Sequence, residues 1–198
     1  IGRRNNNMQW FKLPPKVYFE PNAIKYLSEM EGLERVMIVT DESMVKLGFA
    51  GRIIDQLNRR KNKVQYEVFA GVEPNPDITT VKRGLDIMNT FKPNAIVALG
   101  GGSPMDAAKI MWLFYERPDA DFTELVQKFA DIRKRTVKYP HLGQKAKFIA
   151  VPTTSGTGSE VTPFAVISDK ENDKKYPLAD YAITPHVAIV DPVLVQTV

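Results

Sequence analysis

Cysteine is absent from this chain of 198 residues, and histidine occurs only twice. The absence of cysteine excludes a disulfide scaffold, a thiolate metal site and a cysteine nucleophile. No apolar run reaches the roughly 20 residues of a membrane-spanning helix, and the polar start at 1–7 contains no apolar signal core. We therefore expect a soluble, cytoplasmic protein.

Charge of one sign is also scarce, because 27 Lys and Arg against 23 Asp and Glu leave a net charge of only +4. The two basic clusters, 59–63 and 133–135, each lie where a helix is expected to end, and cations there complement the helix dipole. No aromatic side chains interleave with them and no nucleic-acid-binding motif accompanies them. We interpret both clusters as solvated helix ends and expect no nucleic-acid partner.

The composition, 43% hydrophobic and 25% charged, is typical of a globular domain. Residues 1–9 are polar and predict a linker or tail, whereas residues 10–198 predict one domain. Strands are expected at 17–19, 35–40, 64–69, 95–99, 147–151, 164–168 and 187–190, and helices at 23–30, 43–60, 78–91, 104–116 and 121–130. Asn22 and Asp77 are placed to cap the helices that follow them. Strands separated by helices pair in parallel, so an α/β domain with a mostly parallel sheet follows.

A glycine-rich loop at 100–106, Gly-Gly-Gly-Ser-Pro-Met-Asp, follows the strand at 95–99. Ligands of open parallel sheets bind beyond the carboxyl ends of the strands, and glycines let backbone N–H groups approach them closely. Ser103 is placed as the helix N-cap, Pro104 suits the first helical position, and Asp106 falls where a capping box has its acid. The helix start then suits an anion such as a pyrophosphate. An ordinary capped turn stays the alternative, since the loop matches neither the P-loop nor G-x-G-x-x-G.

Two further features lie at the ends of buried strands. The loop at 152–160, Pro-Thr-Thr-Ser-Gly-Thr-Gly-Ser-Glu, offers many hydroxyl donors for phosphates or ribose, or it is simply a polar loop. Asp41 ends the strand at 35–40, where a carboxylate can accept from ribose hydroxyls and repel a 2′-phosphate. The alternative role for Asp41 is the N-cap of the helix near Ser43. Together with the glycine loop, these features predict a nucleotide ligand.

The motifs in combination resemble the iron-dependent (group III) alcohol dehydrogenases, whose N-terminal domain binds a nicotinamide cofactor. The resemblance is carried by the segments 39–41, 74–76, 100–109, 152–162, 174–178 and 188–192. It implies a Rossmann-like, mostly parallel sheet with helices on both faces. Within the family, the segment 122–135 is similar to the bifunctional aldehyde–alcohol dehydrogenases. Residues 1–9 would then be the end of a linker from an aldehyde dehydrogenase domain.

The resemblance also implies an NAD site. Asp41 would hold the adenosine ribose and favour NAD over NADP, while Lys175 would reach the nicotinamide ribose. Asp106 would brace the glycine loop, and Val166 would pack on the cofactor. The whole implied set of cofactor-binding residues is Asp41, Asn75, Gly100, Gly101, Gly102, Ser103, Asp106, Thr153, Thr154, Thr157, Thr162, Val166 and Lys175.

Iron is the metal that the resemblance implies, held by one Asp and three His in a helical C-terminal domain that follows this one. His141 and His186 lie 45 positions apart and in no family motif. We therefore expect both to be exposed loop residues, with no metal ligand and no catalytic residue in this chain.

The implied reaction is hydride transfer between NADH and acetaldehyde or a similar short aldehyde, as in fermentation. The parent protein is expected to form homo-oligomers and to carry a fused aldehyde dehydrogenase domain, and the chain alone is expected to be inactive. Three alternatives stay open. The first is an iron-type dehydrogenase of another small alcohol or diol. The second is a homo-oligomer assembly module, and the third is a domain that does not bind the cofactor alone.

Overall fold

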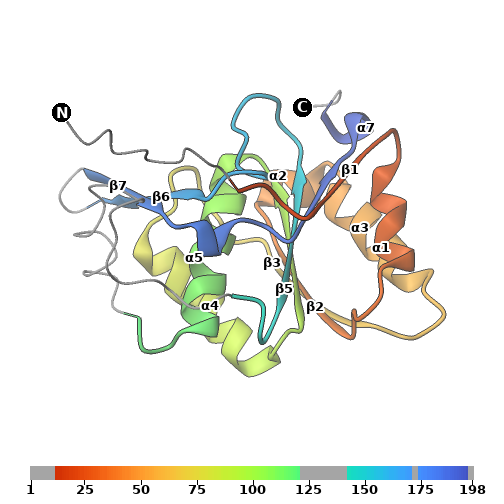
Figure 1. Cartoon of the computed structure of the whole chain (residues 1–198), viewed down its shortest axis with the longest axis horizontal. Coiled ribbons are helices and arrows are strands. Elements are labelled where there is room, and N and C mark those ends of the chain that lie inside the picture. The colour runs from red at the N-terminus through yellow and green to blue at the C-terminus, as the bar shows by residue number, and fades with distance from the viewer. Residues whose placement is uncertain (1–11, 121–141, 171–173, 196–198) are drawn as a thin grey trace, which may run out of the picture.

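The computed structural model describes residues 12–120, 142–170 and 174–195, and at its centre lies a six-stranded sheet (Figure 1). Every pair of neighbouring strands in this sheet is parallel. In spatial order the strands are β1 (Lys16–Phe19), β8 (Val187–Val190), β5 (Lys147–Pro152), β4 (Ala95–Gly100), β2 (Arg35–Val39) and β3 (Gln65–Phe69). The parallel α/β architecture expected from the sequence is thus confirmed.

The strand order creates a point at which the chain changes direction. From β2 the chain proceeds to β3 at one edge of the sheet, whereas from β4, the other neighbour of β2, it proceeds to β5 on the opposite side. Loops that leave two adjacent strands in opposite directions open a crevice at the carboxyl ends of those strands. The loops that follow β2 and β4 carry Asp41 and the glycines, respectively.

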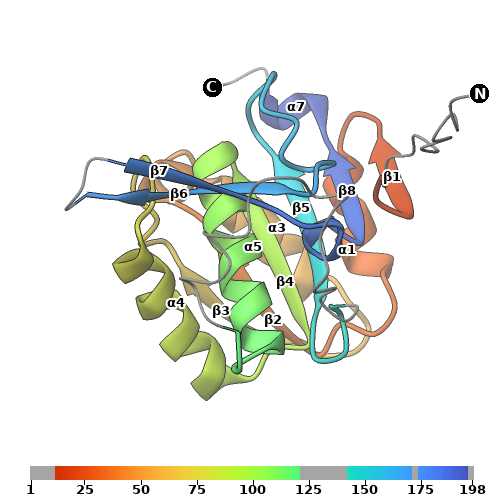
Figure 2. The ribbon, with the colours of Figure 1, turned by 60° about the vertical axis from the view of Figure 1, so that its left-hand side comes forward.

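Helices cover both faces of the sheet. Figure 2 shows α4 (Ile78–Phe91) and α5 (Gly102–Glu116) on the near face, with α1 (Tyr26–Glu29) and α3 (Phe49–Asn58) behind. The side chains of Met37 and Val39 join the core with α4 and α5, while Val36 and Ile38 join the core with α1 and α3. Because β2 is buried on both faces, its sequence is a continuous apolar run rather than an alternating pattern.

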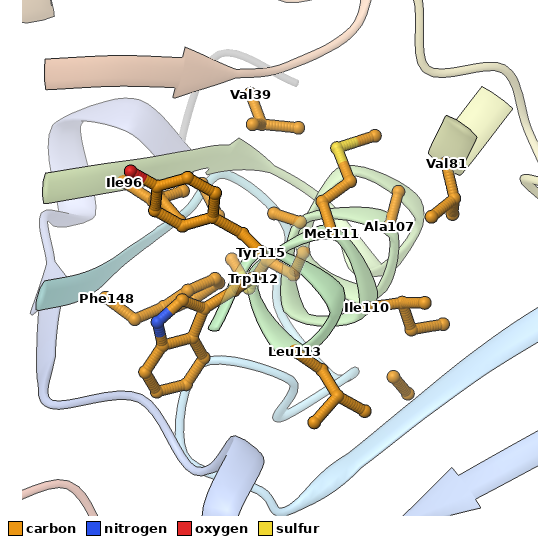
Figure 3. Packing of buried hydrophobic residues seen from close by; sticks show 14 of the residues in the cluster. Val39, Val81, Ile96, Ala107, Ile110, Met111, Trp112, Leu113, Tyr115 and Phe148 are labelled. Atoms are coloured by element: carbon orange, nitrogen blue, oxygen red, sulfur yellow. The ribbon is translucent and has the colours of Figure 1, made fainter. Parts of the chain in front are cut away.

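Helix α5 contributes the largest buried side chain, Trp112, to the near-face core (Figure 3). The indole nitrogen donates to the carbonyl of Ala146 over 3.0 Å, and the ring lies 5.0 Å from that of Phe148. On the other side of α5, an added Cβ at Gly84 of α4 would lie 2.5 Å from the Met111 sulfur. The two helices therefore pack closely at Gly84, where α4 carries no side chain.

The strand expected at 164–168 is not part of the main sheet. It forms β6 (Phe164–Asp169), which pairs in antiparallel fashion with β7 (Lys174–Ala179), a strand that the sequence analysis did not predict. The resulting β6–β7 ribbon lies across α5 (Figure 2). Its Ser168 is tied to the loop before α4, because its N–H donates to the carbonyl of Pro76 over 2.8 Å.

Several helix boundaries differ from the expectation. The helix expected at 43–60 is divided into α2 (Glu42–Lys46) and α3, because Gly48 adopts a left-handed conformation with φ 77°. The helix expected at 23–30 is a 3₁₀ turn, η1 (Ala23–Lys25), followed by the single turn of α1. Asn22 precedes this turn with φ 61° and its side chain makes no cap.

Other boundary predictions hold. Asp77 caps α4 by accepting from the N–H of Thr80 over 2.8 Å, as expected. The remaining short elements are η2 (Tyr181–Ile183) and α7 (Pro192–Val195). The expected tail at 1–9, the expected helix at 121–130 and His141 lie outside the described residues. In the part of the chain that the structure describes, no helix is long and apolar enough to cross a membrane.

Candidate functional site

A cavity of about 610 Å³ opens at the carboxyl ends of β2, β3 and β4, within the size range of small-molecule sites. It lies where the strand order changes direction. Six of the residues implied as cofactor contacts line it: Asp41, Gly101, Gly102, Ser103, Thr153 and Thr154. The three loops that the sequence analysis singled out therefore meet at one cavity.

Two glycines of the loop, Gly100 and Gly101, lie very close to neighbouring side chains. Gly100 has φ +138°, and a Cβ added there would lie 2.8 Å from Cγ of Pro104. A Cβ added to Gly101 would lie 3.2 Å from Cγ2 of Thr154, which belongs to the neighbouring loop. The glycines thus allow two loops, from β4 and β5, to approach each other along the cavity wall.

The start of α5 differs from the capping box expected for it. The N-cap is Gly101, the helix begins at Gly102, and Ser103 therefore lies inside the helix rather than capping it. No side chain caps the first turn. The first N–H groups of a helix have no partner within the helix, so this uncapped end presents donors and a positive dipole end beside the cavity.

Two threonine hydroxyls in the cavity wall are buried without a partner. Among the described residues, nothing hydrogen-bonds to Oγ1 of Thr153 or to Oγ1 of Thr154, although both atoms are inaccessible. Thr153 is fully buried and lies directly after β5. A buried polar group without a partner costs about 1–3 kcal/mol, so such groups call for an explanation. Rotation of either side chain toward the cavity would let a ligand there supply the missing partner.

The two carboxylate oxygens of Asp41 have different surroundings. Its Oδ1 accepts from the N–H of Met44 over 3.0 Å and so caps α2. Its Oδ2 faces the glycine loop, 3.4 Å from where a Cβ at Gly100 would be. The capping alternative from the sequence is therefore confirmed, and it leaves one carboxylate oxygen directed toward the loop beside the cavity.

Seven implied contact residues do not line the cavity: Asn75, Gly100, Asp106, Thr157, Thr162, Val166 and Lys175. Two of them, 100 positions apart, lie together, because Nζ of Lys175 donates to Oδ1 of Asn75 over 2.9 Å. Val166 lies on the outer face of β6 with 36% of its surface exposed. Val166 and Lys175 belong to the β6–β7 ribbon rather than to the cavity wall.

Asp106 has a different set of partners from the one expected. Instead of capping its own helix, it accepts from the hydroxyl of Ser159 over 2.6 Å and from the N–H of Val166 over 3.0 Å. Burial of the carboxyl raises the pKa of Asp106 above its ordinary value. The side chain joins α5 to the segment between the threonine loop and β6.

The sequence analysis missed part of the cavity wall. The loop at 70–74, after β3, lines the cavity together with Arg83 of α4. Arg83 donates to the carbonyl of Gly71 over 3.3 Å. The sequence analysis used the neighbouring segment 74–76 only as part of the family resemblance. Only the pairing of β3 with β2 places the loop at 70–74 next to Asp41.

His186 is not the exposed loop residue that was expected. Its Nδ1 accepts from the N–H of Phe148 over 3.0 Å, and its ring meets the edge of Trp112 at 5.1 Å between centroids. Burial lowers the pKa of His186 below its ordinary value. It lies at the start of β8, at the amino ends of the strands, where it organises backbone rather than the cavity.

Metal-binding side chains are not gathered anywhere in the described residues, which contain no group of three or more His, Asp or Glu that could hold an ion. Among these residues there is no ligand set for iron, which the resemblance places in a helical domain that follows this one.

Among known protein families, the model for iron-containing alcohol dehydrogenase matches residues 14–192 of the chain. The chain is 70% identical, over all of its 198 residues, to an aldehyde-alcohol dehydrogenase of Streptococcus pneumoniae. The alignment covers 22% of that relative, so the chain spans about a fifth of its length.

Two solved structures share the fold. An iron-containing alcohol dehydrogenase from Thermococcus thioreducens superposes with a TM-score of 0.82 at 32% identity, over 96% of this chain and 48% of that one. A sulfoacetaldehyde reductase from Bifidobacterium kashiwanohense in complex with NAD⁺ superposes with a TM-score of 0.77 at 32% identity, again over 96% of this chain and 48% of that one.

Proposed function

The chain belongs to the iron-containing alcohol dehydrogenase family, and from this premise we propose that it binds NAD(H) for an enzyme that reduces a short aldehyde such as acetaldehyde. The observation that carries the proposal is the pair of buried, unpartnered hydroxyls of Thr153 and Thr154 opposite the glycine loop. A ligand with several oxygen acceptors, such as a dinucleotide, would satisfy both hydroxyls.

The residues present fit a nicotinamide dinucleotide. The uncapped start of α5 and the glycine backbone at Gly101 and Gly102 suit the pyrophosphate, whose charge the helix dipole favours. The second carboxylate oxygen of Asp41, Oδ2, suits the hydroxyls of the adenosine ribose and opposes a 2′-phosphate. When bound, NADH supplies the hydride, and the protein supplies its orientation.

The far end of the site suits the nicotinamide. Phe164 and Val166 leave 47% and 36% of their surfaces exposed on β6, which gives a flat ring an apolar surface to lie on. The ammonium of Lys175 and the amide of Asn75, already paired, stand beside this ribbon as donors for a ribose. In this arrangement the cofactor extends from Asp41, past the glycines, to β6.

The activity of the whole protein goes beyond the described residues. We propose that the metal of the family is held by a helical domain outside residues 10–198, and that this chain alone is inactive. The name of the Streptococcus relative supports a fused aldehyde dehydrogenase and an aldehyde substrate in the whole protein. Homo-oligomers, a cytoplasmic location and a role in fermentation are proposed with it.

The proposal is tested by titrating NADH and NADPH into the protein, followed by calorimetry, with the variant Asp41→Asn alongside. Asn keeps an N-cap acceptor for α2 but has no charge. We expect saturable NADH binding, weaker NADPH binding, and loss of this preference in Asp41→Asn. The matched control is Asp77→Asn, the same substitution at the cap of α4, which should leave both affinities unchanged. A folded protein that binds neither cofactor would contradict the proposal.

A further inference from the structure

The only lysine among the described residues that is fully buried is Lys109, in the second turn of α5. Its ammonium group donates to the carbonyl oxygens of Thr162 and Phe164 over 2.7 and 2.8 Å. The third contact, to the hydroxyl oxygen of Ser159, is longer at 3.5 Å. The three donors of the ammonium are thus all directed at the segment 159–164, which leads from the threonine loop into β6.

Asp106, one turn earlier on α5, completes the same network. The hydroxyl of Ser159 donates to Oδ1 of Asp106, so its oxygen is free to accept from Lys109. The other carboxylate oxygen accepts from the N–H of Val166. Two side chains of one helix therefore hold the segment 159–166 at four positions, through the partly buried carboxylate of Asp106 and the fully buried ammonium of Lys109.

Such an arrangement is costly as a means of stability alone. Two charged groups withdrawn from water lose several kcal/mol of hydration each, and apolar side chains of similar size often do as well or better. What the charged groups provide is directional hydrogen bonds, since the ammonium of Lys109 and the carboxylate of Asp106 each contact particular atoms of the segment. A network of this kind is therefore better suited to fixing the place of a segment than to stabilising the fold.

The segment 159–166 needs contacts from another element to fix its position, because the backbone of the loop before it does not determine that position. Gly156 and Gly158 have φ of +123° and +64°, conformations that glycine adopts without strain. The same helix that provides the anion-binding N-terminus also carries Asp106 and Lys109. Both walls of the site are therefore attached to one helix, α5.

We propose that Lys109 is a positioning residue for the cofactor: with Asp106 and Ser159, its ammonium group holds the segment 159–166 on α5 and so sets the place of Thr162 and Val166. This inference rests on the proposed function, because it assumes that the cavity and the ribbon bind NAD(H). It adds a group that touches no cofactor and acts through the segment it holds.

The protonation of Lys109 gives the inference a signature. Burial lowers the pKa of Lys109 to about 8, against the opposing effect of the carboxylates of Asp106 and Glu160. A neutral amine has two N–H donors rather than three, so it cannot maintain all three contacts as a donor. We therefore expect the affinity for NADH to fall as pH rises through about 8.

The test compares Lys109→Met with Lys145→Met, a matched control near the other end of α5, where Nζ of Lys145 donates to the carbonyl of Tyr115. NADH affinity is measured by calorimetry from about pH 6.5 to about pH 9.5, a range that brackets the pKa of Lys109 at about 8. Lys109→Met should bind NADH about tenfold more weakly or worse at neutral pH and lose the transition near pH 8, while Lys145→Met should behave as the unmodified protein.

A second readout is hydrogen exchange at the N–H of Val166, which should become faster in Lys109→Met with an unchanged circular dichroism spectrum. Where Lys109→Met does not fold, Ser159→Ala and the pH profile of the unmodified protein decide. Equal affinity and an equal pH profile in a folded Lys109→Met, or no transition together with unchanged binding in Ser159→Ala, would overturn the inference. If the unmodified protein binds no NADH at any pH, it is the proposed function that fails.

Discussion

Replacement of Thr153 by valine should change stability and cofactor affinity in opposite directions. Valine has nearly the shape of threonine and favours extended backbone, so it fits the end of β5 without a new cavity. The N–H of Thr153, which donates to the carbonyl of Gly100 over 3.0 Å, is unaffected by the change. The substitution therefore removes little more than one buried hydroxyl.

The size of each effect follows from the state of that hydroxyl. In the free protein Oγ1 of Thr153 is buried without a partner among the described residues. An unsatisfied buried hydroxyl costs about 1–3 kcal/mol, so its removal should raise the free energy of unfolding by about 1 kcal/mol. If the same hydroxyl donates to a charged oxygen of NADH, its loss should weaken binding about ten- to a hundredfold.

The assay is urea unfolding followed by circular dichroism, together with NADH calorimetry on the same samples. Thr40→Val is the matched control, because Thr40 is also fully buried at this edge of the sheet but its hydroxyl donates to the carbonyl of Leu99 over 2.8 Å. Thr40→Val should lose about 1 kcal/mol of stability and keep its affinity for NADH. If Thr153→Val loses stability as Thr40→Val does while NADH binds normally, the reasoning from the unpartnered hydroxyl is wrong.

Three further substitutions test other parts of the structure. Asp41→Ala should lower the free energy of unfolding by about 1 kcal/mol in urea, whereas Asp41→Asn, which keeps the cap of α2, should not. Gly100→Ala should lower it by about 1–3 kcal/mol, because φ is +138° and the new methyl group would meet Pro104, and a thermal melt would show this. For His186, the unfolded chain with an ordinary pKa of 6.5 binds a proton that the folded protein, with its lowered pKa, resists. Stability should therefore fall as pH falls below 6.5. His186→Gln, which still accepts from the N–H of Phe148, should lose less stability between pH 7 and pH 5 in urea unfolding than the unmodified protein does. An equal loss in both proteins would assign the acid sensitivity to other groups.

The inner strands β2, β4, β5 and β8 could be predicted from the sequence because each is buried on both faces. A run such as the one at 36–39 is apolar without interruption, and its limits at Arg35 and Thr40 are polar. The helices that separate the runs then imply parallel pairing through right-handed crossovers. The strand predicted at 164–168 is present, but its antiparallel partner could not be predicted, since nothing within the run distinguishes a strand of the main sheet from one half of a separate ribbon.

Helix starts were less predictable, because capping preferences act locally and compete with the length of the preceding strand. Ser103 has the side chain of a good N-cap, yet the helix begins at Gly102, two residues earlier than expected, after β4 has ended at Gly100. Asp77 and Asp41 cap their helices as their residue type suggests, since each directly precedes the first helical residue. Within 43–60 the apolar spacing continues across Gly48, so only its left-handed backbone reveals the break.

By itself, the sequence determined the alternation of strands and helices, the α/β class, and the three loops where a nucleotide-type ligand was expected. These features depend on neighbours within a few positions, where propensity and periodicity act. Only the tertiary structure decided that the hydroxyls of Thr153 and Thr154 have no partner among the described residues, and that the side chain of Lys109 is buried against carbonyls more than 50 positions away. Whether a polar group is paired depends on which distant segments the fold brings beside it, and local sequence carries no record of that distance.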